Sequence, residues 1–120
     1  MKVAVSSRSE NLDSEVDPRF GRAPFFLVVD TDTGDQRMVD NKQNLEASQG
    51  AGVQAAQTVI QQGVDALVTG HCGPKAYRTL NSAGIKIYVG VTGTVRDAVA
   101  KLVAGELAPA TGSDVEGHWV

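Results

Sequence analysis

Two short apolar stretches in the second half of the chain, each followed by a helical pattern, constrain the fold more than any other feature. Asp65 to Thr69 and Ile85 to Val89 have the length and composition of buried strands. Pro74 to Ala83 and Val95 to Ala104, which follow them, have helical spacing and stop before a glycine. Strands that alternate with helices are joined by crossovers, so we expect these two strands to lie parallel in one sheet.

The first half of the chain shows a different pattern. Lys2 to Ser6 alternates around two valines, and Phe25 to Asp30 and Gln36 to Asp40 flank a turn that contains Gly34. Gln49 to Gln62 then has helical spacing. The sequence therefore predicts an α/β fold: a mixed sheet of about five strands with three helices, in which a hairpin precedes two parallel βα units.

The length of the chain, 120 residues, suits one domain with one core. We place that domain at residues 1–109. Residues 110–120 have no hydrophobic period and many small side chains, so we expect a mobile tail. The sequence assigns no role to His118 and Trp119 within it.

Composition argues against two classes of partner. Eleven basic and fourteen acidic residues give a net charge of −3, so no broad positive field is expected to hold nucleic acid. No stretch approaches the roughly 18 consecutive apolar residues of a membrane span. The single cysteine forms no internal disulfide, and the first residues lack the apolar run of a signal peptide. We therefore expect a cytoplasmic protein.

A binding site is expected where the parallel strands end. Ligands of open α/β sheets collect at the carboxyl ends of the strands, so the loops Gly70 to Pro74 and Gly90 to Thr94 should lie side by side there. The loop Ser7 to Ala23 exceeds about 12 to 15 residues, and loops of that length are usually functional or disordered. Helices that begin at Pro74 and Val95 would offer unpaired N–H groups and the positive end of the helix dipole to an anion.

Basic residues near these loops would strengthen an anion site. Arg19, Arg22, Lys75 and Arg96 are the candidates, and a compact, multiply charged anion that touched several loops could gather enough contacts for micromolar binding. Basic residues at helix starts are equally well explained as solvated side chains. The residues alone leave both interpretations open.

Cys72 has three possible roles. As a nucleophile it would need a base within hydrogen-bond reach, and the adjacent His71 is poorly placed for that. As part of a structural zinc site it would need three more Cys or His ligands, which the sequence does not supply at suitable spacing. A small buried apolar residue is the simplest interpretation.

The letters of a dinucleotide-binding motif, G-x-G-x-x-A, occur at Gly50 to Ala55. That motif has to follow a strand directly, whereas here a polar segment lies between the hairpin and the glycines. A flavodoxin-like phosphate loop after the first strand has a similar weakness, because the loop is too long and too acidic. Close packing of a helix against the sheet explains the glycines better.

Three segments together resemble one known family. They are VDPRFGRAPFFLVVDTDTGD, GAGVQAAQTVIQQGVDALVTGHCGPKAYRTLNSAGIKIYVG and TGTVRDAVAKLVAGEL, and the match runs from Lys2 to about Pro109. The chain is identified from them as a member of the dinitrogenase iron-molybdenum cofactor biosynthesis family. The resemblance implies a ribonuclease H-like fold whose first three strands are antiparallel. It also implies a non-enzymatic protein that binds, carries or delivers an anionic metal–sulphur cluster, with an unidentified protein partner for loading or delivery.

The family resemblance implies the cargo and the site. The cargo would be a molybdenum–copper sulphide cluster or a related molybdenum- or iron-containing cluster, held mainly without covalent ligation. Carried over position by position, the site consists of Arg19, Phe20, Gly21, Arg22, His71, Cys72, Gly73, Pro74, Lys75, Thr92, Gly93 and Thr94. Phe20 and Tyr77 would cover the cargo, and His71 or Cys72 could supply a soft metal ligand.

Two other functions remain to be weighed. A module that binds protein or a small phosphorylated metabolite could use the same loops. A nuclease is suggested by the fold, but two-metal cleavage normally needs a carboxylate on the first strand, and KVAVSS has none.

Overall fold

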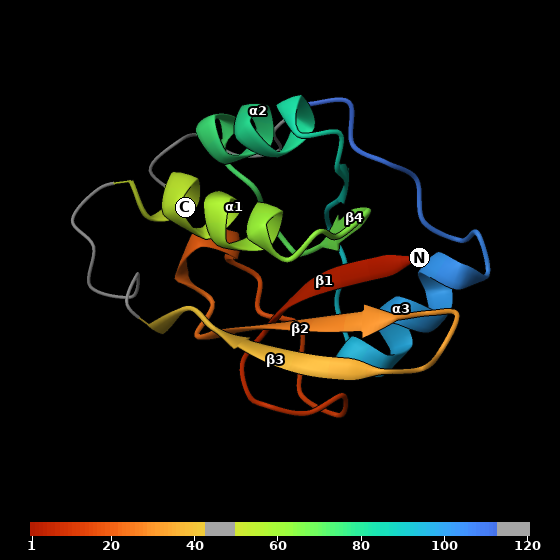
Figure 1. Cartoon of the computed structure of the whole chain (residues 1–120). Helices are drawn as coiled ribbons and strands as arrows, with labels where there is room; N and C mark the ends of the chain where they lie inside the picture. Colours follow the sequence, from red (N-terminus) through yellow and green to blue (C-terminus); the bar gives the residue numbers. More distant parts are fainter. Residues whose placement is uncertain (43–49, 113–120) are drawn as a thin grey trace.

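The computed structural model describes residues 1–42 and 50–112, which contain one five-stranded sheet. Helices cover both faces of this sheet (Figure 1). The strands are β1 (Lys2–Ser7), β2 (Phe25–Asp30), β3 (Gln36–Asp40), β4 (Ala66–Val68) and β5 (Lys86–Tyr88). The helices are α1 (Ala51–Gln61), α2 (Pro74–Ser82) and α3 (Val95–Val103), with a short 3-10 turn, η1, at Phe20–Arg22.

The sheet has the order β3-β2-β1-β4-β5. β1 pairs antiparallel with β2, and β2 with β3, whereas β4 pairs parallel with β1 and β5 pairs parallel with β4. The predicted fold class, a mixed α/β sheet with three antiparallel strands followed by parallel ones, is confirmed. Because β1, β4 and β5 run parallel to one another, the loops that follow them leave from the same end of the sheet.

The sheet divides the core into two layers, one on each face. α1 and α2 cover one face of the sheet and α3 covers the other (Figure 1). The alternation along β1 decides which side chain enters which layer: Ala4 packs beneath α1 and α2, while Val3 and Val5 pack against α3. The small residues of the glycine-rich segment form the buried side of α1, which includes Ala51, Gly52, Ala55 and Ala56. The helix-packing interpretation is confirmed for Gly52, whereas Gly50 is exposed at the start of the helix.

The observed ends of most elements lie within one residue of the predicted ones. β4 and β5 are each one residue shorter at both ends than predicted, although the N–H of Thr69 still donates to the carbonyl of Tyr88 at 3.0 Å. α1 begins at Ala51 after Gly50, which adopts a left-handed conformation with φ of 77°. The predicted helix start at Gln49 lies outside the described residues.

The described chain ends alongside β5. The N–H of Ala110 donates to the carbonyl of Ile87 at 2.7 Å, and the carbonyl of Ala110 accepts from the hydroxyl of Tyr77 at 3.2 Å. His118 and Trp119 lie outside the described residues. The longest helix within the described residues, α1, has 11 residues, and none of these helices is long and apolar enough to cross a membrane.

Candidate functional site

The loops after β4 and β5 lie side by side, as predicted. The N–H of Gly90 donates to the carbonyl of Gly70 at 2.7 Å, and the N–H of Val91 donates to the carbonyl of Thr69 at 3.3 Å. These bonds join the two loops directly beyond the ends of β4 and β5. The two loops therefore form one surface at the carboxyl end of the sheet.

The loop between β1 and β2 closes over this surface as a third wall. The N–H of Val16 donates to the carbonyl of Gly93 at 2.9 Å, and the N–H of Phe20 donates to the carbonyl of His71 at 3.2 Å. Arg19 also pairs with His71 as an isolated parallel bridge. The long loop is thus held by backbone contacts to both neighbouring loops.

A buried polar layer supports the three walls from beneath. The hydroxyls of Ser6 and Thr69 lie 2.8 Å apart, and the Ser6 hydroxyl donates to the carbonyl of Asp17 at 2.8 Å. Ser6 and Thr69 are completely buried. The Asp17 carboxylate accepts from the N–H of Arg19 at 2.9 Å. Because buried hydroxyls need partners, this network fixes the loop relative to β1 and β4.

A pocket of about 300 Å³ lies between the three loops. Its lining combines close backbone from glycines with a few polar side chains; the lining residues are Arg8, Glu15, Val16, Pro18, Gly70, His71, Gly90, Val91, Thr92 and Gly93. Gly90 and Gly93 have φ values of 74° and 93°, which side-chain-bearing residues rarely adopt. The volume suits a small, compact ligand.

Charge at the pocket comes from residues on the long loop. Arg8 lies 3.8 Å from Glu15, and both side chains are largely exposed, at 56% and 69%. Sequence reasoning missed Arg8 and Glu15, although both lie in the loop whose length marked it as functional. Arg19 and Lys75 are exposed, and their side chains form no hydrogen bond or ion pair within residues 1–42 and 50–112.

Backbone N–H groups in two of the predicted site segments lack an acceptor among the described residues. They belong to Thr92 and Gly93 in the pocket loop and to Lys75 in the first turn of α2. N–H groups of this kind can donate to an anion. Thr92 and Gly93 therefore offer donors directly at the pocket.

The expected donors at the start of α3 are not available, and this part of the prediction is wrong. The N–H of Val95 donates to the carbonyl of Ser14 at 2.9 Å, and that of Arg96 to Leu12 at 2.8 Å. The hydroxyl of Thr94 accepts from the N–H of Asp97 at 3.1 Å. The long loop and the Thr94 cap together satisfy the first turn, so of the two predicted helix starts that of α2 is the open one among the described residues.

The structure brings together some of the sequence-predicted site residues and separates others. His71, Thr92 and Gly93 line the pocket. Arg19 adjoins His71, and Lys75 is exposed at the second position of α2. Arg22 and Pro74 are half-buried and lie outside the pocket lining. Gly21 and Gly73 are buried.

The aromatic residues expected to cover a ligand are used elsewhere. Phe20 is completely buried, and its ring packs on Phe26 with centroids 5.3 Å apart. Tyr77 is half-buried against the core beneath α2 and donates its hydroxyl to Ala110. The η1 turn rotates Phe20 into the core, so the prediction of an aromatic cover is wrong for this residue.

Cys72 is also a core residue. It is 0% exposed in the layer beneath α1 and α2, and its Sγ lies 3.8 Å from the carbonyl of Gly73. Ligation of a metal in the pocket by this thiol would require the core to open. Within the described residues, no group of three or more His, Cys, Asp and Glu side chains could hold a metal ion. His71 is the predicted soft ligand that does line the pocket.

Comparison with known proteins agrees with the fold and the family resemblance. The family model described as dinitrogenase iron-molybdenum cofactor matches residues 1–105. The apo form of the orange protein from Desulfovibrio gigas is 42% identical, with a TM-score of 0.93 over 95% of this chain and 96% of that chain. A putative NifB protein from Thermotoga is 34% identical, with a TM-score of 0.82 over 97% and 98% of the two chains. An uncharacterised protein of Methanocaldococcus jannaschii is 28% identical over 89% of each chain.

Proposed function

The chain belongs to the dinitrogenase iron-molybdenum cofactor family, and from this premise we propose that it is a non-enzymatic carrier of an anionic metal–sulphur cluster. The cargo is a molybdenum–copper sulphide cluster or a related molybdenum- or iron-containing cluster. It sits in the pocket between the loops that follow β1, β4 and β5. The carrier works in the cytoplasm and exchanges its cargo with a protein partner.

The observation that carries this proposal is the combination of pocket and donors. The pocket has a volume of about 300 Å³, and the N–H groups of Thr92 and Gly93 at its wall have no acceptor among the described residues. Sulphide ligands of a cluster are anionic acceptors, and several N–H donors can share one such charge. Glycines at three places in the lining let the cluster approach the backbone closely.

Cations at the rim supply the counter-charge. Arg8 lines the pocket and Arg19 adjoins its wall through the bridge to His71. Arg8 lies near Glu15 when the cargo is absent, so cluster binding would let Arg8 turn from that carboxylate toward the anion. Because both side chains are exposed, their own interaction is weak and is easily exchanged.

Retention is therefore mainly non-covalent. His71 is half-buried in the pocket lining and could add one imidazole contact to a copper or iron atom. The buried Cys72 contributes to the core instead of to the cargo. Thr94 acts indirectly, because its cap holds α3 and the loop that precedes it.

The test is anaerobic reconstitution with tetrathiomolybdate and copper, and separately with iron and sulphide, followed by gel filtration. Metal and acid-labile sulphide per chain and the visible spectrum are then measured. A stoichiometric, coloured cluster that stays with the chain is expected, also in Cys72→Ala. Failure to retain either cluster would overturn the proposal.

The competing function has a separate readout in the same sample. A titration with inorganic phosphate, followed through the amide resonances of Thr92 and Gly93, reports on small oxyanions. Saturable shifts at micromolar phosphate, without cluster retention, would favour a module for phosphorylated metabolites that uses this pocket.

A further inference from the structure

β3 leaves an open hydrogen-bonding edge on the sheet. The N–H of Asp30 donates to the carbonyl of Asp35, and the N–H of Asn41 to Pro24, at 2.8 Å each. In an antiparallel pair the bonded residues alternate, so the register of β2 and β3 turns the backbone groups of Gln36, Met38 and Asp40 outward. Within the described residues, these outward N–H and C=O groups have no partner.

The opposite edge of the sheet is different. β5 has three residues, and the carbonyl of Ile87 already accepts from the N–H of Ala110. β3 has five residues, all of them exposed except the half-buried Val39. β3 lies at an edge of the sheet in Figure 1. Of the two edges, it therefore offers the longer row of available backbone groups.

The charged side chains that usually keep an edge strand from pairing are turned away here. Arg37 folds back onto the end of α1, where its guanidinium donates to the side chain of Gln62 at 3.0 and 3.2 Å. Lys42 places its Nζ 4.8 Å from the centre of the Phe25 ring. One carboxylate oxygen of Asp40 accepts from the N–H of Lys42 at 2.7 Å. Charges that project past an edge protect it, and the contacts of Arg37 and Lys42 hold these two charges against the chain's own residues.

We propose that β3 pairs antiparallel with β3 of a second copy of this chain, which joins two five-stranded sheets into one. A two-fold axis perpendicular to the sheet places the same face of both copies on the same side. Side chains that lie opposite each other across the new pair must therefore project from the same face. One register uses all the outward backbone groups of Gln36, Met38 and Asp40. In it, Met38 lies opposite Met38 of the second copy, and Gln36 lies opposite Asp40 of the second copy. About six backbone hydrogen bonds form in this register.

The sequence of β3 is self-complementary in this register. The amide of Gln36 can donate to the second oxygen of Asp40 in the other copy, and no like charges face each other. Met38 is 41% exposed and lines a pocket of about 290 Å³ beside the edge. The two Met38 side chains meet on the face that carries this pocket, and a flexible thioether adapts well to such a gap. The pairing shares no residue with the cluster pocket and does not depend on the proposed function.

Sedimentation velocity and light scattering of the whole chain test the pairing. An interface of this size gives a transient dimer, so samples should span about 10 µM to about 1 mM. The mass of the wild type should rise from 12.6 kDa toward twice that value. Met38→Pro removes an outward N–H that the β2 ladder does not use, so it should keep the chain folded and monomeric. A wild type that stays monomeric, or a dimer that survives in this variant, overturns the proposal.

Two further variants keep the test decisive should Met38→Pro fold poorly. Met38→Lys sets two like charges opposite each other and should abolish the dimer, whereas Val103→Lys, on an exposed apolar residue of α3, should not. In a Cys72→Ala background, Met38→Cys should form a disulfide between chains under mild oxidation. Equal cross-linking of Val103→Cys would contradict the register.

Discussion

The backbone of Pro18 lies so close to Gly70 that a Cβ atom on Gly70 would stand 2.6 Å from the Cα of Pro18 and 2.8 Å from its carbonyl oxygen. Real Cβ atoms do not come this close to backbone. Gly70 thus lets the long loop after β1 lie directly on the loop after β4. The pocket exists in its present form because of this approach.

Gly70→Ala should therefore push the long loop away from the strand ends. We expect a loss of about 1 to 3 kcal/mol in the free energy of unfolding, as for other overpacked sites. Urea unfolding measures this loss, and amide shifts of Val16 and Gly93 report the displacement of the loop. Gly112→Ala is the matched control, since nothing lies within 4 Å of a Cβ there. An unchanged spectrum for Gly70→Ala would contradict the close approach.

The buried hydroxyl pair beneath the pocket should couple energetically. Ser6→Ala leaves the carbonyl of Asp17 and the hydroxyl of Thr69 without their partner, which costs about 1 to 3 kcal/mol. Thr69→Val alone should cost about 1 kcal/mol, and the double variant less than the sum of the two. Thermal or urea unfolding of the four proteins gives the coupling. Thr79→Val, which removes an exposed hydroxyl bond to Lys75, should change stability little; strict additivity at Ser6 and Thr69 would refute the network.

Most of the fold follows from local rules that the sequence displays. In the second half of the chain each apolar strand is followed by a helical pattern, and this pattern predicts parallel strands. In the structure β4 pairs parallel with β1, and β5 pairs parallel with β4. Pro74 and the Thr94 cap mark two helix starts. Both starts can be predicted because they depend only on residues that are adjacent or three apart in the sequence. The place of the pocket follows from the same topology.

The directions of individual side chains could not be predicted in the same way. Phe20 enters the core because the η1 turn packs against α1 and the Phe20 ring contacts Phe26. Cys72 enters the core just before α2 begins. The donors of α3 are satisfied by Leu12 and Ser14, which are about eighty residues away in sequence. Contacts between residues this far apart in the sequence depend on the path of the long loop after β1. No hydrophobic periodicity in the sequence predicts that path.

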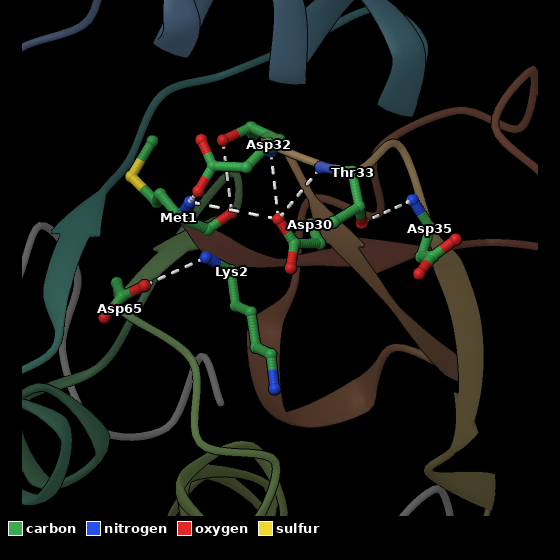
Figure 2. A network of polar contacts seen from close by, with 8 residues as sticks. Met1, Lys2, Asp30, Asp32, Thr33, Asp35 and Asp65 are labelled. Atoms are coloured by element: carbon green, nitrogen blue, oxygen red, sulfur yellow. Dashed lines mark hydrogen bonds and ion pairs between the residues drawn. The ribbon is translucent and has the colours of Figure 1, made fainter.

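Two groups near the amino-terminal end of β1 should make the stability of the fold decrease at high pH and at low pH. Figure 2 shows these groups, with Met1 beside Asp30 and Asp32. The hydrogen bond to Asp32, 2.7 Å long, raises the pKa of the terminal amine from 8.0, with weaker help from the charges of nearby carboxylates. The N–H of Asp32 donates to Asp30 and lowers the pKa of that carboxyl from 3.8.

The signs of the two effects are opposite. A raised amine pKa stabilises the fold below pH 8.0, and this contribution is lost as the pH rises through the folded pKa. A lowered carboxyl pKa stabilises the fold above pH 3.8, and this contribution is lost as the pH falls through the folded pKa. Urea unfolding midpoints measured between about pH 2 and 10 should decrease at the alkaline end and at the acid end, which we call the alkaline and acid limbs. Asp32→Asn should flatten the alkaline limb, while Asp35→Asn, whose carboxylate contacts neither group, should leave it unchanged; an alkaline limb that survives in Asp32→Asn would contradict the assignment.

Cys72 should be unreactive while the chain is folded. Its side chain is fully buried, so a thiol reagent such as dithionitrobenzoate can reach it only when the core opens. The native protein should react at least about 100-fold more slowly than the urea-unfolded protein. Comparable rates in the two states would show that the thiol is accessible. In that case its exclusion as a ligand would have to be reconsidered.

Arg8 should contribute to cargo retention in proportion to its charge at the pocket. Its side chain is 56% exposed, and solvent screens exposed charges, so Arg8→Gln should weaken retention by about three- to tenfold. Glu15→Gln should act in the opposite direction, because it removes the carboxylate that competes for Arg8. The readout is the salt concentration at which reconstituted chain loses molybdenum and copper on gel filtration. Arg96→Gln changes the net charge equally but breaks an ion pair with Asp13 outside this pocket, so retention should stay at the wild-type level. An equal loss in Arg8→Gln and Arg96→Gln would mean that net charge alone, and not the position of Arg8, governs the binding.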